Sequence, residues 1–264
     1  MPAAVPRVTR RLRLPSPAAA ALLACGVALS AGAAAAAEPP PRWTFGALAI
    51  ERDAPYRGLD EDLLVVPLVR FEGERAYLRG LRGGIVAVRE GGFELGPFLQ
   101  VRGDGYDAGD SGFLAGMDDR RFSLDAGVAA SWRRERFGQV ELSAATVVLD
   151  RSGGHELEAA YTALFRAGGF TFVPQLSLKW QSDDLVDYYY GVRAGEATAW
   201  RPAYRADAAT TPELSLLATR RFGPHWTLYA RVGHAWLPDG IADSPIVADD
   251  SRTTVMVGLG WSPR

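Results

Sequence analysis

The sequence predicts an all-β protein: a single antiparallel transmembrane β-barrel of about 12 strands, preceded by a cleaved signal peptide. Three observations carry this prediction. The amino-terminal segment is basic and then rich in alanine, which is typical of an export signal. The rest of the chain alternates between apolar and polar residues over long runs, which indicates strands with two different faces. The apolar faces carry aromatic residues near their ends, as the lipid-facing surfaces of outer-membrane barrels do.

The composition excludes several functional classes. The 264 residues include 29 basic and 31 acidic side chains, so the net charge of −2 lacks the basic excess of a nucleic-acid-binding protein. A hydrophobic content of 48% is too high for a disordered chain. One cysteine excludes a disulfide framework and any site built from several cysteines. We therefore expect no cofactor and no nucleic-acid partner.

Residues 1–37 form the predicted signal peptide. Four arginines within the first 13 residues precede an apolar stretch that ends in Ala35 and Ala37, the small residues that a signal peptidase requires. An uncleaved membrane anchor is the alternative, because the apolar stretch is nearly long enough to span a bilayer. Its alanine-rich composition is only weakly lipophilic, however, so we expect cleavage. Residues 38–264 are then one barrel domain in the outer membrane of a Gram-negative cell.

The strands are predicted from alternation with a period of two. Phe172, Leu176 and Trp180 share one face of a strand, for example, while Gln175 and Lys179 share the other. Ten strands is the rival count, and residues 75–90 can be read as one kinked strand or as two. The predicted strands span residues 43–51, 62–71, 75–90, 93–103, 120–134, 137–149, 155–167, 169–182, 184–193, 212–222, 225–236 and 251–262.

A soluble β-sandwich can show the same alternation, and three features favour the barrel over it. The chain carries an export signal. Its runs extend over ten or more residues, whereas strands of soluble sheets usually have about 5–6. The apolar faces also include many alanines, such as Ala126, Ala130 and Ala159, which are tolerable against lipid but would fill a sandwich core poorly.

Long connections are predicted at 52–61, 104–119, 194–211 and 237–250. In a barrel with these 12 strands the first, third and fourth lie on the extracellular side. The second would lie on the periplasmic side, where long loops are unusual. Either the strand count is therefore off by one near that loop, or residues 104–119 fold inward.

The polar faces carry charges of both signs, and these are the candidate site residues. Either they pair as struts across a narrow, plugged lumen, or they line a pore that selects solutes. The near balance of the two signs favours struts, since a selective pore usually has one sign in excess. The predicted lumen charges are Arg121, Asp125, Arg133, Glu141, Glu156, Glu158, Arg166, Lys179, Glu213, Arg221 and Arg231.

Neither catalysis nor metal binding is indicated. His225 and His234 are nine residues apart, so on one strand they point to opposite faces, and His155 follows a glycine pair as a turn residue would. None has a recognisable nucleophilic partner, and we expect no enzyme activity. The acidic residues between Asp104 and Asp119 lack the alternating spacing of a calcium loop, so we interpret them as a solvated loop without a metal.

Several segments resemble the MipA/OmpV family of outer-membrane proteins. They are Tyr188-Tyr189-Tyr190-Gly191-Val192 followed by Glu196-Ala197, the segment Asp243-Ser244-Pro245-Ile246-Val247, and the closing Gly258-Leu259-Gly260-Trp261. Weaker similarities are Pro55-Tyr56-Arg57-Gly58, Pro67 and Leu114-Ala115-Gly116-Met117, all in family order. One departure is the ending Ser262-Pro263-Arg264, because such barrels tend to end on an aromatic residue. Trp261 must then serve as the terminal aromatic.

This resemblance implies a non-catalytic barrel with no catalytic residues to transfer. The member that gives the family its name links a lytic murein transglycosylase to a peptidoglycan synthase. The resemblance therefore implies a scaffold for murein-remodelling enzymes, which would contact periplasmic turns or residues 38–42. Two alternatives remain open: a narrow porin-like channel for small polar solutes, and a surface adhesin acting through residues 194–211 and 237–250.

Overall fold

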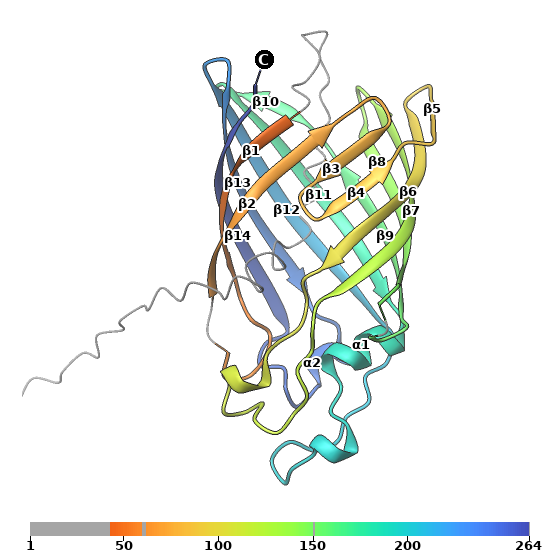
Figure 1. Cartoon of the computed structure of the whole chain (residues 1–264), viewed down its shortest axis with the longest axis vertical. Helices are drawn as coiled ribbons and strands as arrows, with labels where there is room; N and C mark the ends of the chain where they lie inside the picture. Colours follow the sequence, from red (N-terminus) through yellow and green to blue (C-terminus); the bar gives the residue numbers. More distant parts are fainter. Residues whose placement is uncertain (1–42, 60–61, 150, 264) are drawn as a thin grey trace, which may run out of the picture.

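The computed structural model describes residues 43–59, 62–149 and 151–263, and within them the chain forms one closed antiparallel barrel (Figure 1). The expected signal peptide and residues 38–42 lie outside the described residues. The strands are β1 (Trp43–Arg52), β2 (Asp62–Glu72), β3 (Ala76–Arg79), β4 (Arg82–Ile85), β5 (Val88–Glu90), β6 (Phe93–Arg102), β7 (Ser123–Arg134), β8 (Gly138–Val147), β9 (His155–Thr162), β10 (Phe165–Ala167), β11 (Phe170–Gln181), β12 (Ala209–Phe222), β13 (Trp226–Trp236) and β14 (Ser251–Trp261).

The 14 segments make 12 barrel strands over the part of the chain that the structure describes, because two segments continue others. β4 and β5 both pair with β6, and β9 and β10 both pair with β11. The barrel closes where β1 pairs with β14, from Phe45 opposite Trp261 to Arg52 opposite Thr254. The predicted fold class and strand number are therefore confirmed.

Two differences from the predicted list of 12 strands compensate each other: residues 75–90 follow the two-strand alternative, and residues 184–193 are wrongly predicted as a strand. Residues 75–90 form two strands, because the chain reverses between Arg79 and Arg82 with Gly80 at a positive φ of 61°. Residues 184–193 are not a strand, since most of them belong to the helix α1 (Asp183–Tyr190). One strand is gained and one is lost, so the total of 12 is unchanged.

The gain of one strand and the loss of another also determine the end of the barrel at which each connection lies. The connections after β1, β6, β8, β11 and β13 all lie at one end of the barrel, the loop end, at the bottom of Figure 1. The short connections after β2, β5, β7, β10 and β12 lie at the other end, the turn end, together with Trp43 and Trp261. The reversal between β3 and β4 lies part-way along the wall. The predicted strand count was thus off by one before residues 104–119, which is one of the two alternatives that the sequence left open, and this loop lies on the same side as the other long loops. Besides α1, the loop end carries α2 (Asp239–Ala242) and the 3₁₀ turns η1 (Ala108–Asp110) and η2 (Ala194–Glu196).

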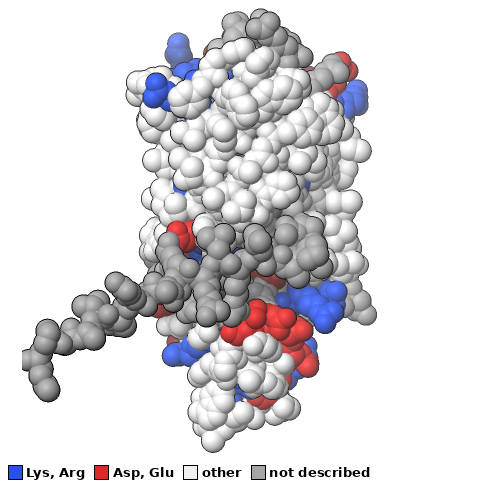
Figure 2. Space-filling model, turned by 60° about the vertical axis from the view of Figure 1, so that its left-hand side comes forward, with Lys and Arg blue, Asp and Glu red and all other residues white. Residues whose placement is uncertain are grey.

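The outer surface of the barrel is apolar, as the alternation predicts. Leu176 and Leu178 of β11, Leu214 of β12 and Val257 of β14 are about half exposed. Between the two charged ends, Figure 2 shows a broad band of surface with very few charged residues. Exposed aromatic rings gather at the turn end, as at a membrane interface. They include Trp43, Phe45, Phe93, Trp132, Phe165, Phe222, Trp226 and Trp261. Among the described residues no helix is long and apolar enough to cross a membrane.

The inner surface is not uniformly polar, which the alternation did not predict. A buried apolar cluster lies inside the barrel and includes Val66 and Leu68 of β2, Val173 of β11 and Leu217 of β12. With the residues that β1, β13 and β14 add, the cluster draws on six consecutive strands and covers the inner face of that part of the wall. This part of the interior is packed like a protein core.

Prolines within strands mark places where the sheet ladder is interrupted. Pro97 lies opposite the break between β4 and β5, and Pro174 opposite the break between β9 and β10. Pro67 lies in β2, whose residues 63–69 pair with β1 and with no other strand that the structure describes. Since proline has no N–H to donate, it is tolerated at such edges. Pro67, a weak family similarity in sequence, thus marks an edge in the barrel wall.

Glycines at the closing seam explain the Gly-Leu-Gly-Trp segment. Gly46 of β1 lies directly opposite Gly260 of β14, and a Cβ on Gly46 would lie 2.0 Å from the carbonyl oxygen of Leu259. A Cβ on Gly258 would lie 2.7 Å from the carbonyl oxygen of Ala47. The seam therefore closes tightly because these positions lack side chains.

Candidate functional site: the cap and the chamber beneath it

The long loops fold together into a packed cap over the loop end. We number the long loops after β1, β6, β11 and β13 as the first to the fourth. A buried cluster joins these four loops, with Tyr56 from the first, Leu114 from the second, Tyr190 from the third and Ile246 from the fourth. Leu114 and Ile246 are completely buried. The helix α1 contributes Leu185, Val186, Tyr189 and Tyr190 to this cluster. The cap is thus a small hydrophobic core outside the barrel wall.

Most of the segments that resemble a known family meet in this cap, whereas Gly258–Trp261 and Pro67 lie in the barrel wall. The N–H of Arg57 donates to the carbonyl oxygen of Ile246 at 2.8 Å, and Tyr56 pairs with Val247. The rings of Tyr56 and Tyr190 stack with centroids 5.7 Å apart, and the hydroxyl of Ser244 donates to the carbonyl oxygen of Tyr190. Segments far apart in the sequence therefore form one structural unit.

The other motif residues have structural roles in or beside the cap. Gly191 ends α1, and a Cβ there would lie 2.5 Å from the carbonyl oxygen of Asp187. Val192 pairs with Tyr204, and Tyr189 is buried. In Asp243-Ser244-Pro245, Asp243 is exposed, and the carbonyl oxygen of Pro245 accepts from Arg57 Nε at 3.0 Å.

A buried ion pair ties the second loop to the third. Arg120 donates to both carboxylate oxygens of Glu196, at 3.0 and 2.8 Å, and the N–H groups of Asp118 and Arg193 donate to the same carboxylate. Burial alone would raise the pKa of Glu196, but these hydrogen bonds lower it below its usual value. Glu196 is therefore ionised in the folded cap.

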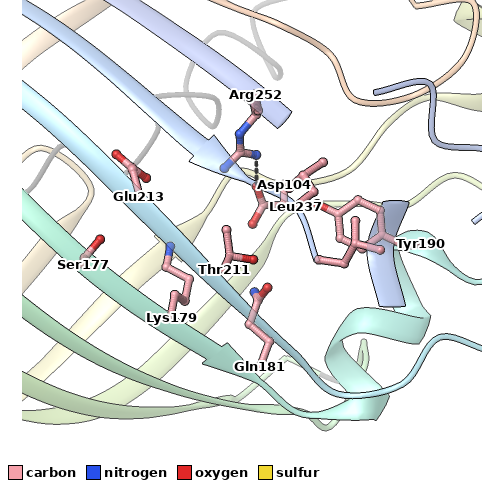
Figure 3. A pocket seen from close by; sticks show the side chains of 10 residues that line it. Asp104, Ser177, Lys179, Gln181, Tyr190, Thr211, Glu213, Leu237 and Arg252 are labelled. Carbon is pink, nitrogen blue, oxygen red and sulfur yellow. Dashed lines mark ion pairs between the residues drawn. The ribbon is translucent and has the colours of Figure 1, made fainter. Parts of the chain in front are cut away.

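A small polar chamber lies directly beneath the cap. Figure 3 shows side chains from β11, β12 and β14 pointing into it, with Tyr190 closing it on the cap side. Its volume is about 30 Å³, which is enough for roughly two water molecules. Its polar lining consists of Asp104, Ser177, Lys179, Gln181, Tyr190, Thr211, Glu213 and Arg252.

Comparison with known proteins identifies the family. The model of the family described as MltA-interacting protein MipA matches residues 45–263. The chain belongs to this family. It is 31% identical over 222 residues to the putative outer membrane protein YiaT of Escherichia coli K12, covering 83% of this chain and 89% of that protein. It is 29% identical over 242 residues to the MltA-interacting protein of the same strain, covering 90% of this chain and 96% of that protein. Among solved structures it is similar to the COG4313 outer membrane channel from Pseudomonas putida F1, with TM-score 0.40, 13% identity, and coverage of 84% of this chain and 96% of that chain.

The resemblance seen in the motifs is thereby confirmed, and this MipA-family protein is an outer-membrane β-barrel. Barrels of this kind have short periplasmic turns and longer extracellular loops. The loop end, with the cap and the chamber, is therefore extracellular. The turn end is periplasmic.

Eight of the predicted lumen charges lie on inward-facing rows of this MipA-family barrel, and most of these have polar partners. Glu141 accepts from Arg82 at 2.8 Å, and Glu213 from Arg231 at 2.9 Å. Arg133 donates to Gln139 at 2.7 Å. Lys179 lies directly opposite Glu158 in register.

Arg102, a buried lumen charge at the loop end of β6 that contacts several carboxylates, was not among the predicted residues. Arg102 Nη2 lies 2.6 Å from Asp125 Oδ2, and Arg102 Nη1 lies 2.8 Å from Glu156 Oε2. Arg82, which stacks on Phe98 at 3.7 Å, was missed as well. Both arginines lie at inward-facing positions of their strands. The alternation of the sequence was therefore sufficient to predict them as lumen residues.

Three predicted lumen residues lie elsewhere. Arg121 precedes β7 and its side chain is exposed, while its backbone holds α1: its N–H donates to the Tyr188 hydroxyl at 3.2 Å, and its carbonyl oxygen accepts from the Tyr189 hydroxyl at 3.4 Å. Arg166 and Arg221 have the expected inward parity, but they lie exposed at the turn end. The barrel ends before it encloses them.

Four acids of the predicted solvated loop, Asp107, Asp110, Asp118 and Asp119, are exposed, but several of them also make specific contacts. Asp107 accepts from the N–H of Gly109 at 3.0 Å, Asp119 accepts from the N–H of Ala108 at 3.0 Å, and Asp118 pairs with Arg193. The acids therefore fix the loop's own backbone and its contact with the third loop. Over the described ranges, no group of three or more metal-ligating side chains is positioned to hold an ion.

The histidines occupy separate places. The backbone N–H of His155, not its ring, donates to the hydroxyl of Ser182 at 3.0 Å. His225 Nδ1 lies 2.8 Å from the carbonyl oxygen of Ser262, and His234 Nδ1 lies 3.1 Å from the hydroxyl oxygen of Thr253. The structure brings none of the three rings together.

Asp104 joins the chamber to the barrel wall. Its carboxylate lies 3.6 Å from Arg102, 3.8 Å from Arg252 and 3.9 Å from Arg52. Burial would raise the pKa of Asp104, but the surrounding guanidinium groups outweigh burial and lower it to about 2. A carboxyl whose pKa is lowered by folding stabilises the folded state above its ordinary pKa, and this contribution is lost as the pH falls through the folded value.

The Asp104→Asn variant tests this linkage. We expect the wild type to be more stable at pH 7, and the difference to shrink between pH 3.8, the ordinary value, and about pH 2, where the two proteins converge. Urea unfolding in detergent, followed by tryptophan fluorescence across this range, measures the effect. Asp110→Asn is the control, because Asp110 is exposed and lies in the same loop. A difference in stability between wild type and Asp104→Asn that does not depend on pH would contradict the lowered pKa of Asp104.

Proposed function

We propose that this barrel is a non-catalytic scaffold that holds murein-remodelling enzymes, a lytic transglycosylase and a peptidoglycan synthase, at the periplasmic face of the outer membrane. Membership of the MipA family supports this role, as does similarity over nearly the whole chain to a protein named for its interaction with MltA. The charges inside the barrel are the observation that carries the proposal.

Those charges suit a filled interior better than a conduit. Arg102, Arg82 and Arg231 each contact a carboxylate within 2.6–2.9 Å, and an apolar cluster occupies a further part of the lumen. A selective pore presents an excess of one sign to passing solutes, whereas paired charges act as struts between strands. A rigid barrel closed by a cap supports partners at its ends.

The periplasmic turns are the surface where such partners would bind. The turn between β7 and β8 exposes Phe137 to 73%, and its carbonyl oxygen accepts from the hydroxyl of Tyr161 at 2.6 Å. Glu135 and Arg136 beside it are exposed. An exposed aromatic ring on a fixed turn, surrounded by charges, is the kind of anchor that dominates protein interfaces.

Pull-down from envelope extracts tests the proposal. The tagged wild-type barrel should capture a lytic transglycosylase and a peptidoglycan synthase, and Phe137→Ser should reduce the capture several-fold. Trp200→Ser is the matched control, because Trp200 is also an exposed aromatic (55%) but lies at the loop end. Absence of murein enzymes from the wild-type eluate would count against the scaffold.

The polar chamber favours a rival function, a narrow channel for small polar solutes. Planar-bilayer recording of the purified protein separates the two functions. The scaffold predicts a silent membrane, since the chamber holds only about 30 Å³ beneath the packed cap. Steady ohmic steps would support the channel instead.

A further inference from the structure

Two arginines lie on lipid-facing rows of the barrel at the turn end. Arg220 of β12 has the same parity as Leu214, Leu216 and Phe222, whose side chains are exposed on the outer wall. Arg134 of β7 has the same parity as Val128 and Trp132. A charge on the lipid face is costly in the hydrocarbon and is tolerated near the interface. These two positions therefore mark the level of the lipid headgroups.

Aromatic rings hold both guanidinium groups. Arg220 lies directly opposite Phe170 in register, and its guanidinium carbon lies 5.0 Å from the ring centre of Phe170 and 5.3 Å from that of Phe222. The guanidinium carbon of Arg134 lies 5.0 Å from the ring of Trp132. These distances are within the range of cation–π contacts. Stacking engages the faces of a guanidinium and leaves its N–H edges available.

Neither arginine makes an ion pair with any residue that the structure describes, and both side chains are exposed. Arg89, in β5 at the same end, is different, because it donates to Glu94 and to the carbonyl oxygen of Glu74, each at 2.8 Å. Two cations with free N–H groups at headgroup level suit an anion that lies at that level.

We propose that Arg220 and Arg134 bind the phosphate groups of anionic phospholipids in the periplasmic leaflet. A guanidinium can donate two parallel hydrogen bonds to one phosphate. The aromatic rings restrict the side chain before the lipid arrives and so reduce the entropy lost on binding. Arg220, which contacts two rings, is the stronger site.

Native mass spectrometry of the full-length mature barrel, released from nanodiscs containing phosphatidylglycerol, tests the proposal. Arg220→Gln should weaken phosphatidylglycerol binding about tenfold, as expected for the loss of charged hydrogen bonds, and Arg134→Gln should weaken it less. Phe170→Leu, which keeps the charge but removes one ring, should weaken it about threefold. Arg89→Gln is the control and should bind like the wild type. Heat-dependent gel mobility verifies that each variant is folded.

Three results would overturn the proposal. One is unchanged phosphatidylglycerol binding in the Arg220→Gln/Arg134→Gln double variant. Another is an equal loss in Arg89→Gln, which would indicate a general charge effect. The third is displacement of the lipid by millimolar inorganic phosphate, which would indicate a small-anion site rather than a lipid site.

Discussion

Replacing Arg102 with alanine should destabilise the barrel by about 3–5 kcal/mol, the usual effect of leaving buried charge without its partner. The Arg102 side chain is only 4% exposed, and it holds Asp125 and Glu156, which are 1% and 8% exposed. Without the guanidinium these carboxylates face each other in the lumen, together with Asp104. Equilibrium unfolding by urea in lipid vesicles measures the loss.

Two variants make this prediction specific. Arg89→Ala removes an arginine whose side chain is about half exposed and which pairs with Glu94, so it should cost less than about 1 kcal/mol. Combining Arg102→Met with Asp125→Asn and Glu156→Gln removes the positive and the negative charges together, and should recover much of the lost stability. If the free energy of unfolding of Arg102→Ala lies within 1 kcal/mol of the wild-type value, the ion pairs of Arg102 do not stabilise the barrel as proposed.

The barrel wall could be predicted from sequence because lipid imposes a simple rule on it. Every spanning strand must present an apolar row outward, and this rule is visible in Leu176, Leu178 and Trp180 without any knowledge of their neighbours. The same rule fails for the interior. Val66 and Leu68 face inward and belong to a buried apolar cluster, which the expectation of a polar inner face did not include.

The error at 184–193 shows how tertiary packing can override a local pattern. Valine and tyrosine favour strands, and the run ending in Tyr190 reads as one. The signals for a helix were also present, with Asp183 and Asp184 in the first turn and Gly191 at the end. Burial of Leu185 and Tyr189 in the cap then stabilises a helix too short to persist alone.

The cap itself could not be predicted from sequence, because its contacts join residues that are far apart in the chain. Tyr56 pairs with Val247, and Arg120 binds Glu196 across 76 positions. Motif resemblance marked these segments without indicating that they touch. The convergence of the cap segments gives a physical reason for their resemblance: most of the family motifs build the extracellular closure of the barrel, and Gly258–Trp261 builds its seam.

Arg201→Ala should loosen the third loop of the cap and speed its proteolysis at least tenfold. Arg201 is 1% exposed, and its guanidinium donates to the carbonyl oxygens of Glu196, Phe113 and Ala115, so it ties the third loop to the second. No carboxylate in the described part of the chain pairs with it. Hydrogen bonds from a charged donor are worth about 1.5–3 kcal/mol, and their loss raises the population of the open loop by the corresponding factor.

Chymotrypsin digestion of intact cells measures this opening, because Trp200 and Tyr204 are cleavage sites on the extracellular loop. Arg205→Ala is the matched control: its side chain is 81% exposed and lies 3.9 Å from Asp183, so the digestion rate should stay near that of the wild type. Arg201→Lys keeps the charge but loses the forked donor geometry, and should fall between the two. Equal digestion rates for Arg201→Ala and Arg205→Ala would mean that aromatic packing, such as the contact of Phe113 with Trp200 at 4.8 Å, holds the loop without the guanidinium. If the rates differ as expected, one buried side chain holds the outermost part of the cap closed.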